Sequence, residues 1–287
     1  MKEPFVSIII PTYNGSKCIK KAIESILDQE FLNFEIIVID DGSTDTTSEI
    51  IKELGKRDSR VRYFKNEKNL GFVKSLNRGL KESKGKYIAR LDDDDFWSDK
   101  KKLLKQVNFL LSNPGYVLVG GGLIKVNEQG KEAVRYLLPE SDEDIRKSIL
   151  VSNCFGHSAV VFLKEAAQIV GGYDEEFGFF ADRSLWLKLG TIGKFYNFQE
   201  YFVCYLDKEL DNETYRARDY QIRRKLILNI KLRARYKNFY PGFYRSLTLC
   251  FFSFFYSFLP YKKYFWPVTS KMRTMIFGAP SYKYKEP

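Results

Sequence analysis

Short apolar runs rich in Ile and Val alternate with amphipathic stretches along the first part of this chain. Such runs are typical of buried β-strands, and the predicted strands cover residues 5–10, 34–39, 61–64 and 87–91. Apolar residues recur at helical spacing between them, and the predicted helices cover residues 16–29, 44–54, 73–82 and 101–111. Strands that alternate with helices in this way predict a parallel, doubly wound α/β sheet.

The pattern changes after Pro114. Two apolar runs flank three consecutive glycines, residues 120–122, and we expect the glycines to interrupt the sheet as a flexible or close-approach turn. Further elements are predicted downstream: a hairpin near residues 128–130, a short helix from about residue 142, a strand over 157–163 and a helix over 182–189. From about residue 214 the pattern is helical and very basic.

Polar side chains follow three of the predicted strands. They are Thr12, Tyr13 and Asn14 after the first strand, Asp40 and Asp41 after the second, and four consecutive aspartates, residues 92–95, after the fourth. In doubly wound sheets, ligands bind at the carboxyl ends of the strands. We therefore expect these three groups to share one rim of the sheet.

The four aspartates indicate a site for a hard cation. Carboxylates this close repel one another, and some stay protonated at neutral pH unless a cation or hydrogen-bond donors offset the charge. Mg²⁺ or Mn²⁺ binds one or two carboxylates together with substrate phosphates. A solvated acidic turn that caps the next helix is the alternative, and the aspartate run alone does not decide between the two.

Two familiar kinds of site are excluded. The first strand is followed by residues 11–15 (PTYNG), which contain neither the Gly-rich loop of a nicotinamide-type Rossmann domain nor a P-loop. A diphosphate would therefore need another source of positive charge, such as a metal at the aspartates. The single His157 and four widely spaced cysteines do not form the usual zinc site.

Three sequence blocks, in their order and spacing, resemble the family 2 glycosyltransferases: residues 6–14 (VSIIIPTYN), residues 35–45 (EIIVIDDGSTD) and the aspartates at 92–95. A fourth block, residues 171–187, contains GGYDE, Asp182 and LWL and resembles the acceptor region of that family. The resemblance covers roughly residues 5–206. It implies a GT-A fold, which is a Rossmann-like, mostly parallel sheet flanked by helices. It also implies a nucleotide-sugar donor, a divalent metal and inversion at the anomeric carbon.

Carried over by position, the resemblance implies a donor site and a metal site. Asp41 would hydrogen-bond the uracil or another base, with Asp40 beside it. Asp94 would bind Mn²⁺ or Mg²⁺ and Asp92 would lie near the ribose or the metal, although four aspartates in a row leave the register open by one residue. The remaining donor-site candidates are Pro11, Thr12, Tyr13, Asn14, Arg90, Asp93 and His157, and a structural ion pair is the alternative for Arg90.

Asp182 stands where the family has its catalytic base. An inverting transfer needs a carboxylate that accepts the proton of the attacking hydroxyl. Many members have Glu-Asp here, whereas this chain has Ala181-Asp182, so the acceptor contacts made by the missing acid are in question. A helix-capping aspartate is the alternative interpretation.

The chain has a net charge of +11, and this charge is concentrated at its end. Residues 213–287 contain 16 Lys/Arg against 3 Asp/Glu, whereas residues 1–212 contain 31 against 33. We therefore predict a catalytic domain over residues 1–212, with a nucleotide-binding half (about 1–115) and an acceptor-binding half (about 116–212). A basic, aromatic helical extension follows over residues 213–287.

Fourteen aromatic residues lie between Phe239 and Trp266, with Lys and Arg on both sides. This composition favours a helix in a membrane interface, where clustered cations meet anionic lipids. The apolar run at 247–259 is too continuous to face phosphates, which argues against nucleic acid, and its 13 residues are too few to span a bilayer. A homo-oligomer interface or a helical cover over the catalytic domain remains an alternative. Because no signal-peptide pattern precedes the first strand, we expect a cytoplasmic protein at the inner face of the membrane.

These observations predict a metal-dependent, inverting glycosyltransferase that uses a nucleotide sugar, with a UDP-sugar favoured, and a glycan or lipid-linked acceptor. A role in cell-surface polysaccharide or glycolipid assembly would follow. Neither the Gln-x-x-Arg-Trp motif nor the membrane-spanning helices of processive synthases are present, so we expect single sugar transfers. A catalytically idle relative that binds nucleotide sugar or organises a membrane complex is the alternative. A sugar-1-phosphate nucleotidyltransferase would need a Gly-rich, Arg-containing N-terminal loop that this chain lacks.

Overall fold

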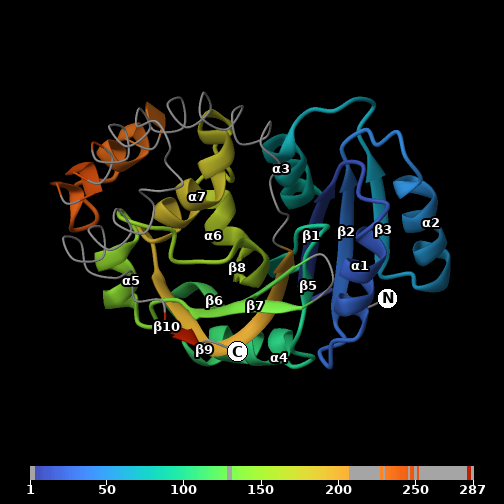
Figure 1. The fold of residues 1–287 in the computed structure, drawn as a ribbon, viewed down its shortest axis with the longest axis horizontal. Coiled ribbons are helices and arrows are strands. Elements are labelled where there is room, and N and C mark those ends of the chain that lie inside the picture. Colours follow the sequence, from blue (N-terminus) through green and yellow to red (C-terminus); the bar gives the residue numbers. More distant parts are fainter. Residues whose placement is uncertain are drawn as a thin grey trace.

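A ten-stranded sheet forms the centre of the computed structural model (Figure 1). Eight strands follow one path in the order β10-β7-β6-β8-β4-β1-β2-β3, and β5 and β9 pair off this path. The structure describes residues 4–127, 131–206, 227–228, 230–244, 246–248, 251 and 283–285.

The first half of the sheet is parallel, as predicted. Its strands, in chain order, are β1 (Val6–Thr12), β2 (Phe34–Asp40), β3 (Val61–Lys65) and β4 (Tyr87–Arg90). The helices that connect them are α1 (Ile19–Leu27), α2 (Thr47–Arg57) and α3 (Phe72–Glu82). Every residue of β1 and β2 is buried, which explains why these strands appear in the sequence as continuous apolar runs.

Alternate residues of β1 contact helices on opposite faces of the sheet. Ile8 and Ile10 belong to the core that includes α1 and α2, whereas Ile9 belongs to the core that includes α3. Helix α3 lies very close to β1, because a Cβ atom on Gly79 would be only 2.4 Å from Cγ2 of Ile9. This close packing fixes the N-terminus of α3 beside the carboxyl end of β1.

The second half of the sheet is mainly antiparallel. Its strands are β5 (Phe96–Trp97), β6 (Tyr116–Val126), β7 (Glu132–Leu137), β8 (Val161–Leu163), β9 (Lys194–Leu206) and β10 (Lys283–Lys285). The helices are α4 (Lys102–Ser112), α5 (Asp142–Ser148), α6 (Lys164–Ile169) and α7 (Ala181–Leu189), with 3₁₀ segments η1 (His157–Ala159) and η2 (Glu175–Phe180). Strand β8 lies between β4 and β6, antiparallel to both, and thereby joins the two halves. Strands β6 and β7 form the predicted hairpin, whose turn at 128–130 lies outside the described residues.

The prediction that three glycines interrupt the sheet is wrong. Strand β6 is continuous through residues 120–122, although its pairing with β9 shifts register there. Each glycine is instead required by a close neighbour, because an added Cβ would be 2.2 Å from Oδ1 of Asn197, 2.3 Å from Cδ2 of Phe202 and 2.7 Å from Cδ2 of Leu137, respectively. The expectation of a close approach was therefore correct, but the approach occurs within a strand.

Two other boundaries differ from the prediction. The expected strand over 157–163 begins as the 3₁₀ segment η1, and only Val161–Leu163 pairs with neighbouring strands. Helix α2 starts at Thr47 and continues through Gly55 to Arg57. The carboxylate of Asp45 accepts hydrogen bonds from the backbone N–H groups of Thr47 and Ser16 at 3.1 and 3.2 Å, which ties the start of this helix to the loop after β1.

The described helical part of the C-terminal extension packs against α7 and the elements around it. Leu232, Tyr236 and Tyr240 are buried in the same core as Leu185 and Trp186 of α7. The predicted domain boundary at 212/213 and most of the apolar run at 247–259 lie outside the described residues. Among the helices that the structure describes, none combines the length and the apolar character needed to cross a bilayer.

Candidate active site

The carboxyl ends of β1, β2 and β4 surround a cavity of about 310 Å³. The residues that line it come from the end of β1, from the loops after β1, β2, β3 and β4, and from the first turn of α3: Pro11, Thr12, Tyr13, Asp41, Asn69, Phe72, Ser75, Asp92 and Asp93. The three polar groups predicted to share a rim therefore do lie together. The parallel register accounts for this, since Thr12 pairs with Asp40 and Ile9 pairs with Arg90.

The adjacent aspartates after β2 have different surroundings. Asp40 is fully buried, where it accepts hydrogen bonds from the backbone N–H of Ser43 and from the hydroxyl of Tyr63, both at 2.7 Å. It stabilises the turn into α2 and does not line the cavity. Asp41 does line the cavity, and it accepts hydrogen bonds from the backbone N–H groups of Leu70 and Gly71 at 2.9 and 2.8 Å.

Asn14 joins two loops at the cavity rim and is not one of the lining residues. Its backbone has a positive φ of 53°, which asparagine tolerates better than most residues. Its side-chain oxygen accepts a hydrogen bond from the backbone N–H of Thr44, and its own N–H donates to the hydroxyl of Ser43, both at 2.9 Å. The loop after β1 is thereby held against the loop after β2.

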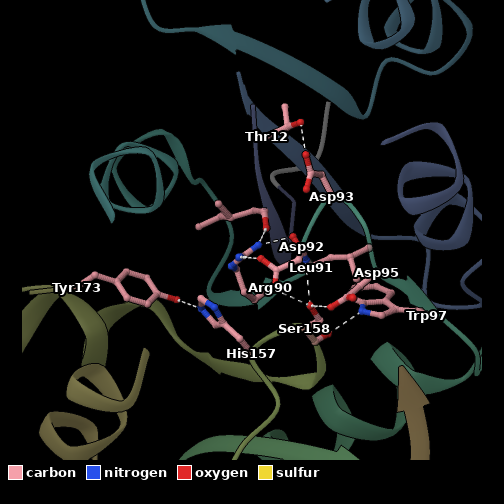
Figure 2. A network of polar contacts seen from close by, with 11 residues as sticks. Thr12, Arg90, Leu91, Asp92, Asp93, Asp95, Trp97, His157, Ser158 and Tyr173 are labelled. Atoms are coloured by element: carbon pink, nitrogen blue, oxygen red, sulfur yellow. Dashed lines mark hydrogen bonds and ion pairs between the residues drawn. The ribbon is translucent and has the colours of Figure 1, made fainter. Parts of the chain in front are cut away.

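Residues 92–95, here called the aspartate loop, are tied to neighbouring elements by hydroxyl groups (Figure 2). Thr12 donates a hydrogen bond to Asp93. Ser158 of η1 donates to Asp95, and its oxygen accepts the backbone N–H of Asp92 at 3.0 Å. Burial, together with the neighbouring carboxylates, raises the pKa of Asp93 to about 6 and raises the pKa of Asp95 well above its ordinary value.

Arg90 lies beneath the aspartate loop and is completely buried. Its guanidinium donates to the carbonyl of Ile9 at 3.2 Å and to the carbonyl of Leu91, and it forms an ion pair with Asp92 (Figure 2). Arg90 does not line the cavity. Its ion pair with Asp92 is the interaction that the sequence left as an alternative to phosphate contact. Its cationic group also lies 5.2 Å from the ring centre of Phe72.

His157 is enclosed by aromatic rings and does not line the cavity. Its Nε2 is 2.9 Å from the hydroxyl of Tyr173, and the rings of Phe72 and Trp186 lie 6.0 and 5.7 Å away, centre to centre. Burial, and then the nearby charge of Arg90, hold the pKa of His157 well below its ordinary value. The imidazole is therefore neutral at neutral pH, and it contacts both Phe72 at the start of α3 and Tyr173 in the loop after α6.

Asp182 lies in the first turn of α7 and belongs to the same electrostatic environment as Asp92. Its carboxylate accepts hydrogen bonds from Nδ2 of Asn153 at 2.7 Å and from the backbone N–H of Arg183 at 2.6 Å. Burial raises the pKa of Asp182, and the negative charge of Asp92 raises it further, whereas these two hydrogen bonds lower it. The preceding Ala181 is packed in the core, where the acid that many family members have would be buried among apolar side chains.

A larger cavity of about 590 Å³ adjoins the first, because Phe72 lines both. It lies between the start of α3 and the η2 segment, and its lining residues are Leu70, Gly71, Phe72, Val73, Lys74, Glu175, Gly178 and Phe179. The side chains of Phe72 and Phe179 are 46% and 72% exposed, so apolar rings are available to a ligand there. Segment η2 leads directly into Asp182.

The carboxylates at the smaller cavity fit a divalent cation that binds together with a diphosphate. Within the described residues, no group of three or more His, Cys, Asp or Glu side chains forms a complete protein-only metal site. Asp92 and Asp93 line the cavity, and Mg²⁺ and Mn²⁺ need only one or two carboxylates when phosphate oxygens supply further ligands. Burial raises the pKa values of Asp93 and Asp95, and the negative charge of neighbouring carboxylates raises them further, a charge that a cation would offset.

Several residues of the site were not identified from the sequence. Asn153 and Ser158 lie in a polar stretch around His157, which offered a weak signal, and Tyr173 lies in the GGYDE block without an assigned role. Phe72 carried no signal at all, because an aromatic residue at the start of a helix is ordinary. Its importance depends on which elements meet around it.

Comparison with solved structures defines the class of the fold. The mannosyltransferase PcManGT from Pyrobaculum calidifontis, in complex with GDP-Man and Mn²⁺, aligns with a TM-score of 0.63 and 14% identity over 95% of this chain and 81% of that chain. TarS 1–349 from S. aureus in complex with UDP-GlcNAc aligns with a TM-score of 0.60 and 20% identity over 83% of this chain and 75% of that chain. The fold is that of the GT-A glycosyltransferases.

The family model described as glycosyl transferase family 2 matches residues 7–168, which is more than half of the chain. The chain therefore belongs to glycosyl transferase family 2. A relative from Campylobacter jejuni, named GalNAc(5)-diNAcBac-PP-undecaprenol beta-1,3-glucosyltransferase, is 29% identical over 87% of each chain. Other curated relatives, from Rickettsia felis, Haemophilus influenzae and Rickettsia bellii, are longer proteins, and the chain matches 20%, 65% and 18% of their respective lengths.

The contacts of Arg90 lead to a prediction about stability. We expect Arg90→Met to lower the free energy of unfolding by about 2–4 kcal/mol, because it leaves buried carbonyls and Asp92 without their partner. Arg57→Met is the matched control: its ion pair with Glu53 is surface-exposed, and we expect a change of at most about 0.5 kcal/mol. Urea unfolding of both variants measures the difference, and equal stabilities would contradict the structural role of Arg90.

Proposed function

We propose that this chain transfers a sugar from a nucleotide-sugar donor, a UDP-sugar, to a hydroxyl of a glycan or lipid-linked acceptor. The transfer is inverting, metal-dependent and non-processive. One observation supports this more than any other: two adjoining cavities share Phe72, with the aspartate loop at the smaller one and segment η2, which leads into Asp182, at the larger one.

The smaller cavity is the proposed donor site. Asp41 already accepts three hydrogen bonds, from the backbone N–H groups of Leu70 and Gly71 and from Nδ2 of Asn66. A carboxylate has about four acceptor positions, so it can accept one more from a nucleobase. The ring of Tyr13 is 49% exposed at the same cavity and offers a surface for stacking. The diphosphate would then lie toward Asp92 and Asp93.

Asp94 and Asp92 are the proposed ligands of Mn²⁺ or Mg²⁺, as their positions in the family motif imply. The placement of Asp92 at the cavity supports this assignment. When bound, the cation stabilises the negative charge that develops on the departing diphosphate. Arg90 holds the Asp92 carboxylate in place from below.

Asp182 is the proposed general base. The acceptor hydroxyl gives its proton to the Asp182 carboxylate, the hydroxyl oxygen forms a bond to the anomeric carbon, and the bond from that carbon to the diphosphate oxygen breaks. The nucleoside diphosphate leaves with the electron pair of the broken bond. One base on the face opposite the leaving group gives inversion, and no covalent sugar–enzyme intermediate is needed.

The relatives support this choice of substrates. The Campylobacter jejuni relative, matched over 87% of its length, is named for transfer to an undecaprenol-linked glycan, which supports a lipid-linked acceptor here. TarS in complex with UDP-GlcNAc and PcManGT in complex with GDP-Man and Mn²⁺ support a nucleotide sugar and a divalent metal. A non-catalytic nucleotide-sugar-binding protein is the competing proposal, supported by the unusual Ala181 before Asp182.

A lipid-linked acceptor implies contact with a membrane, and we place this contact in the extension over residues 213–287, at the cytoplasmic face. Within its described part, Phe239, Tyr244 and Phe251 expose 57%, 83% and 53% of their surfaces. Exposed aromatic rings beside Lys and Arg suit a lipid–water interface. A second copy of the chain is the alternative partner for the same surface.

We expect Asp182→Asn to lower kcat at least about 100-fold while nucleotide-sugar affinity stays unchanged, because only the proton acceptor is lost. Asp28→Asn is the control: Asp28 is exposed and lies far from Asp182 in the sequence, so this variant should retain full activity. In the unmodified protein, turnover should fall as the pH decreases through a pKa above the ordinary aspartate value, since the base must be ionised. Undiminished turnover of Asp182→Asn would remove Asp182 as the base, and a parent protein without turnover on any acceptor would favour the non-catalytic proposal.

Calorimetric titration tests the donor and metal sites. UDP, GDP and their sugars are titrated into the protein with Mn²⁺ and with a chelator, and we expect metal-dependent binding that is strongest for a uridine nucleotide. Asp94→Asn should weaken Mn²⁺-dependent binding at least about tenfold, and Asp92→Asn should weaken it too, whereas Asp93→Asn should have less effect. Failure of the folded protein to bind any nucleotide would contradict the proposed donor site. If Asp93→Asn weakens binding more than Asp94→Asn, the metal ligands are shifted by one residue from the proposed positions.

Flotation of the full-length protein with vesicles tests the membrane proposal. We expect the protein to float with vesicles containing anionic phosphatidylglycerol, and to do so less at high salt, because Lys and Arg contribute about 1 kcal/mol each near an anionic surface. Vesicles of phosphatidylcholine alone are the control. If the protein floats with neither kind of vesicle and forms a concentration-dependent dimer, the extension is an oligomer interface.

A further inference from the structure

Residues 149–158, here called the bridging segment, contact both groups of carboxylates in the proposed site. The segment follows α5 and ends in η1. Near its middle, Nδ2 of Asn153 donates a hydrogen bond of 2.7 Å to Oδ2 of Asp182. At its end, Ser158 bonds the backbone N–H of Asp92 and the carboxylate of Asp95. One short stretch of chain therefore sets the position of the proposed base relative to the aspartate loop.

Two buried arginines hold the beginning of the bridging segment. Arg183 donates from Nε and Nη2 to the carbonyl of Ile149, at 2.9 and 2.6 Å. Arg233 donates from Nε to the carbonyl of Leu150 and from Nη2 to the carbonyl of Val151, the latter at 2.9 Å. Arg183 follows Asp182 in α7, but Arg233 comes from the C-terminal extension, some fifty residues further along the chain.

Arg233 is not an ordinary surface cation of the basic extension. It is only 4% exposed, and its neighbour Leu232 is packed in the core of the acceptor half. By contrast, Lys231 is exposed and pairs with Glu176 at the surface. A guanidinium buried in this way is costly unless its donors are satisfied, and here two consecutive backbone carbonyls satisfy them.

We infer that Arg233 and Asn153 are positioning residues for the transfer reaction. Arg233 fixes the carbonyls of Leu150 and Val151, which places Asn153 two residues later, and Asn153 orients the carboxylate of Asp182. The C-terminal extension is thus part of the active-site support, in addition to any contact with a membrane or another subunit. This inference rests on the proposed function of Asp182 as the base.

The test compares Asn153→Ala, Arg233→Met and Arg233→Lys with Lys231→Met as the control, all in the full-length protein. We expect Asn153→Ala and Arg233→Met to lower kcat about 10- to 100-fold with the KM for the donor unchanged, because a misplaced base affects chemistry and not donor binding. Arg233→Lys should restore part of kcat, since an ammonium can still bond a carbonyl. Lys231→Met should behave like the parent protein.

The pH profile separates positioning from general support of the fold. The hydrogen bond from Asn153 lowers the pKa of Asp182, so Asn153→Ala should move the acid limb of kcat to higher pH. The charged groups that face Asp182, namely Arg183 on its own helix and Asp92 in the loop after β4, are unchanged in this variant. The control Lys231→Met should leave the acid limb in place.

Defined outcomes would overturn the inference. Two results would show that these residues support the fold alone. In the first, Asn153→Ala keeps both the kcat and the acid limb of the parent protein. In the second, kcat and donor affinity fall together in Asn153→Ala and in Arg233→Lys. Should Arg233→Met fail to fold, Arg233→Lys and Asn153→Ala decide by the same criteria. Turnover that survives in Asp182→Asn would refute the proposed base itself, whereas loss in Asp182→Asn without loss in Asn153→Ala would refute only this inference.

Discussion

Much of this molecule depends on the burial of one charged side chain, Arg90. A fully buried guanidinium needs hydrogen-bond partners. The two terminal nitrogens of Arg90 have them in the carbonyls of Ile9 and Leu91 and the carboxylate of Asp92, whereas its Nε has no partner among the described residues. These contacts join two neighbouring parallel strands to the aspartate loop. The same cation lies against Phe72 and adds to the effect of burial in lowering the pKa of His157, so it also influences the contact between the two halves of the sheet.

The two halves contribute different chemistry to the site. The parallel half supplies loops that converge because its strands all end at the same edge, and those loops line a small polar cavity. The antiparallel half supplies η2, which lines the larger cavity together with the start of α3, and α7, which carries Asp182 with its raised pKa. Strand β8 pairs with both halves, and the bridging segment before it contacts carboxylates of both. This division fits a reaction in which a charged leaving group lies at the aspartate loop and a proton acceptor lies on α7.

Sequence patterns predicted the parallel half well and the second half less well. Strands β1 and β2 are buried on both faces, so burial imposes an apolar run that is visible without a structure. The glycines of β6 were misjudged because their cause is non-local: Asn197, Phe202 and Leu137 approach them from elsewhere in the chain. Similarly, a strand was expected over 157–163, but the contacts of Ser158 with Asp92 and Asp95 accompany a 3₁₀ turn at its start.

The sequence by itself determined the class of sheet, the aspartate-rich rim and the resemblance to a family, because these depend on local periodicity and on residues close together in the chain. It could not distinguish Asp40 from Asp41, since only packing makes one a buried turn stabiliser and the other a cavity residue. It also could not assign Arg90 to an ion pair, Asn153 to Asp182, or Arg233 to the bridging segment. Those assignments depend on hydrogen bonds between residues far apart in the chain, and only the folded structure decides which partners lie within bonding distance.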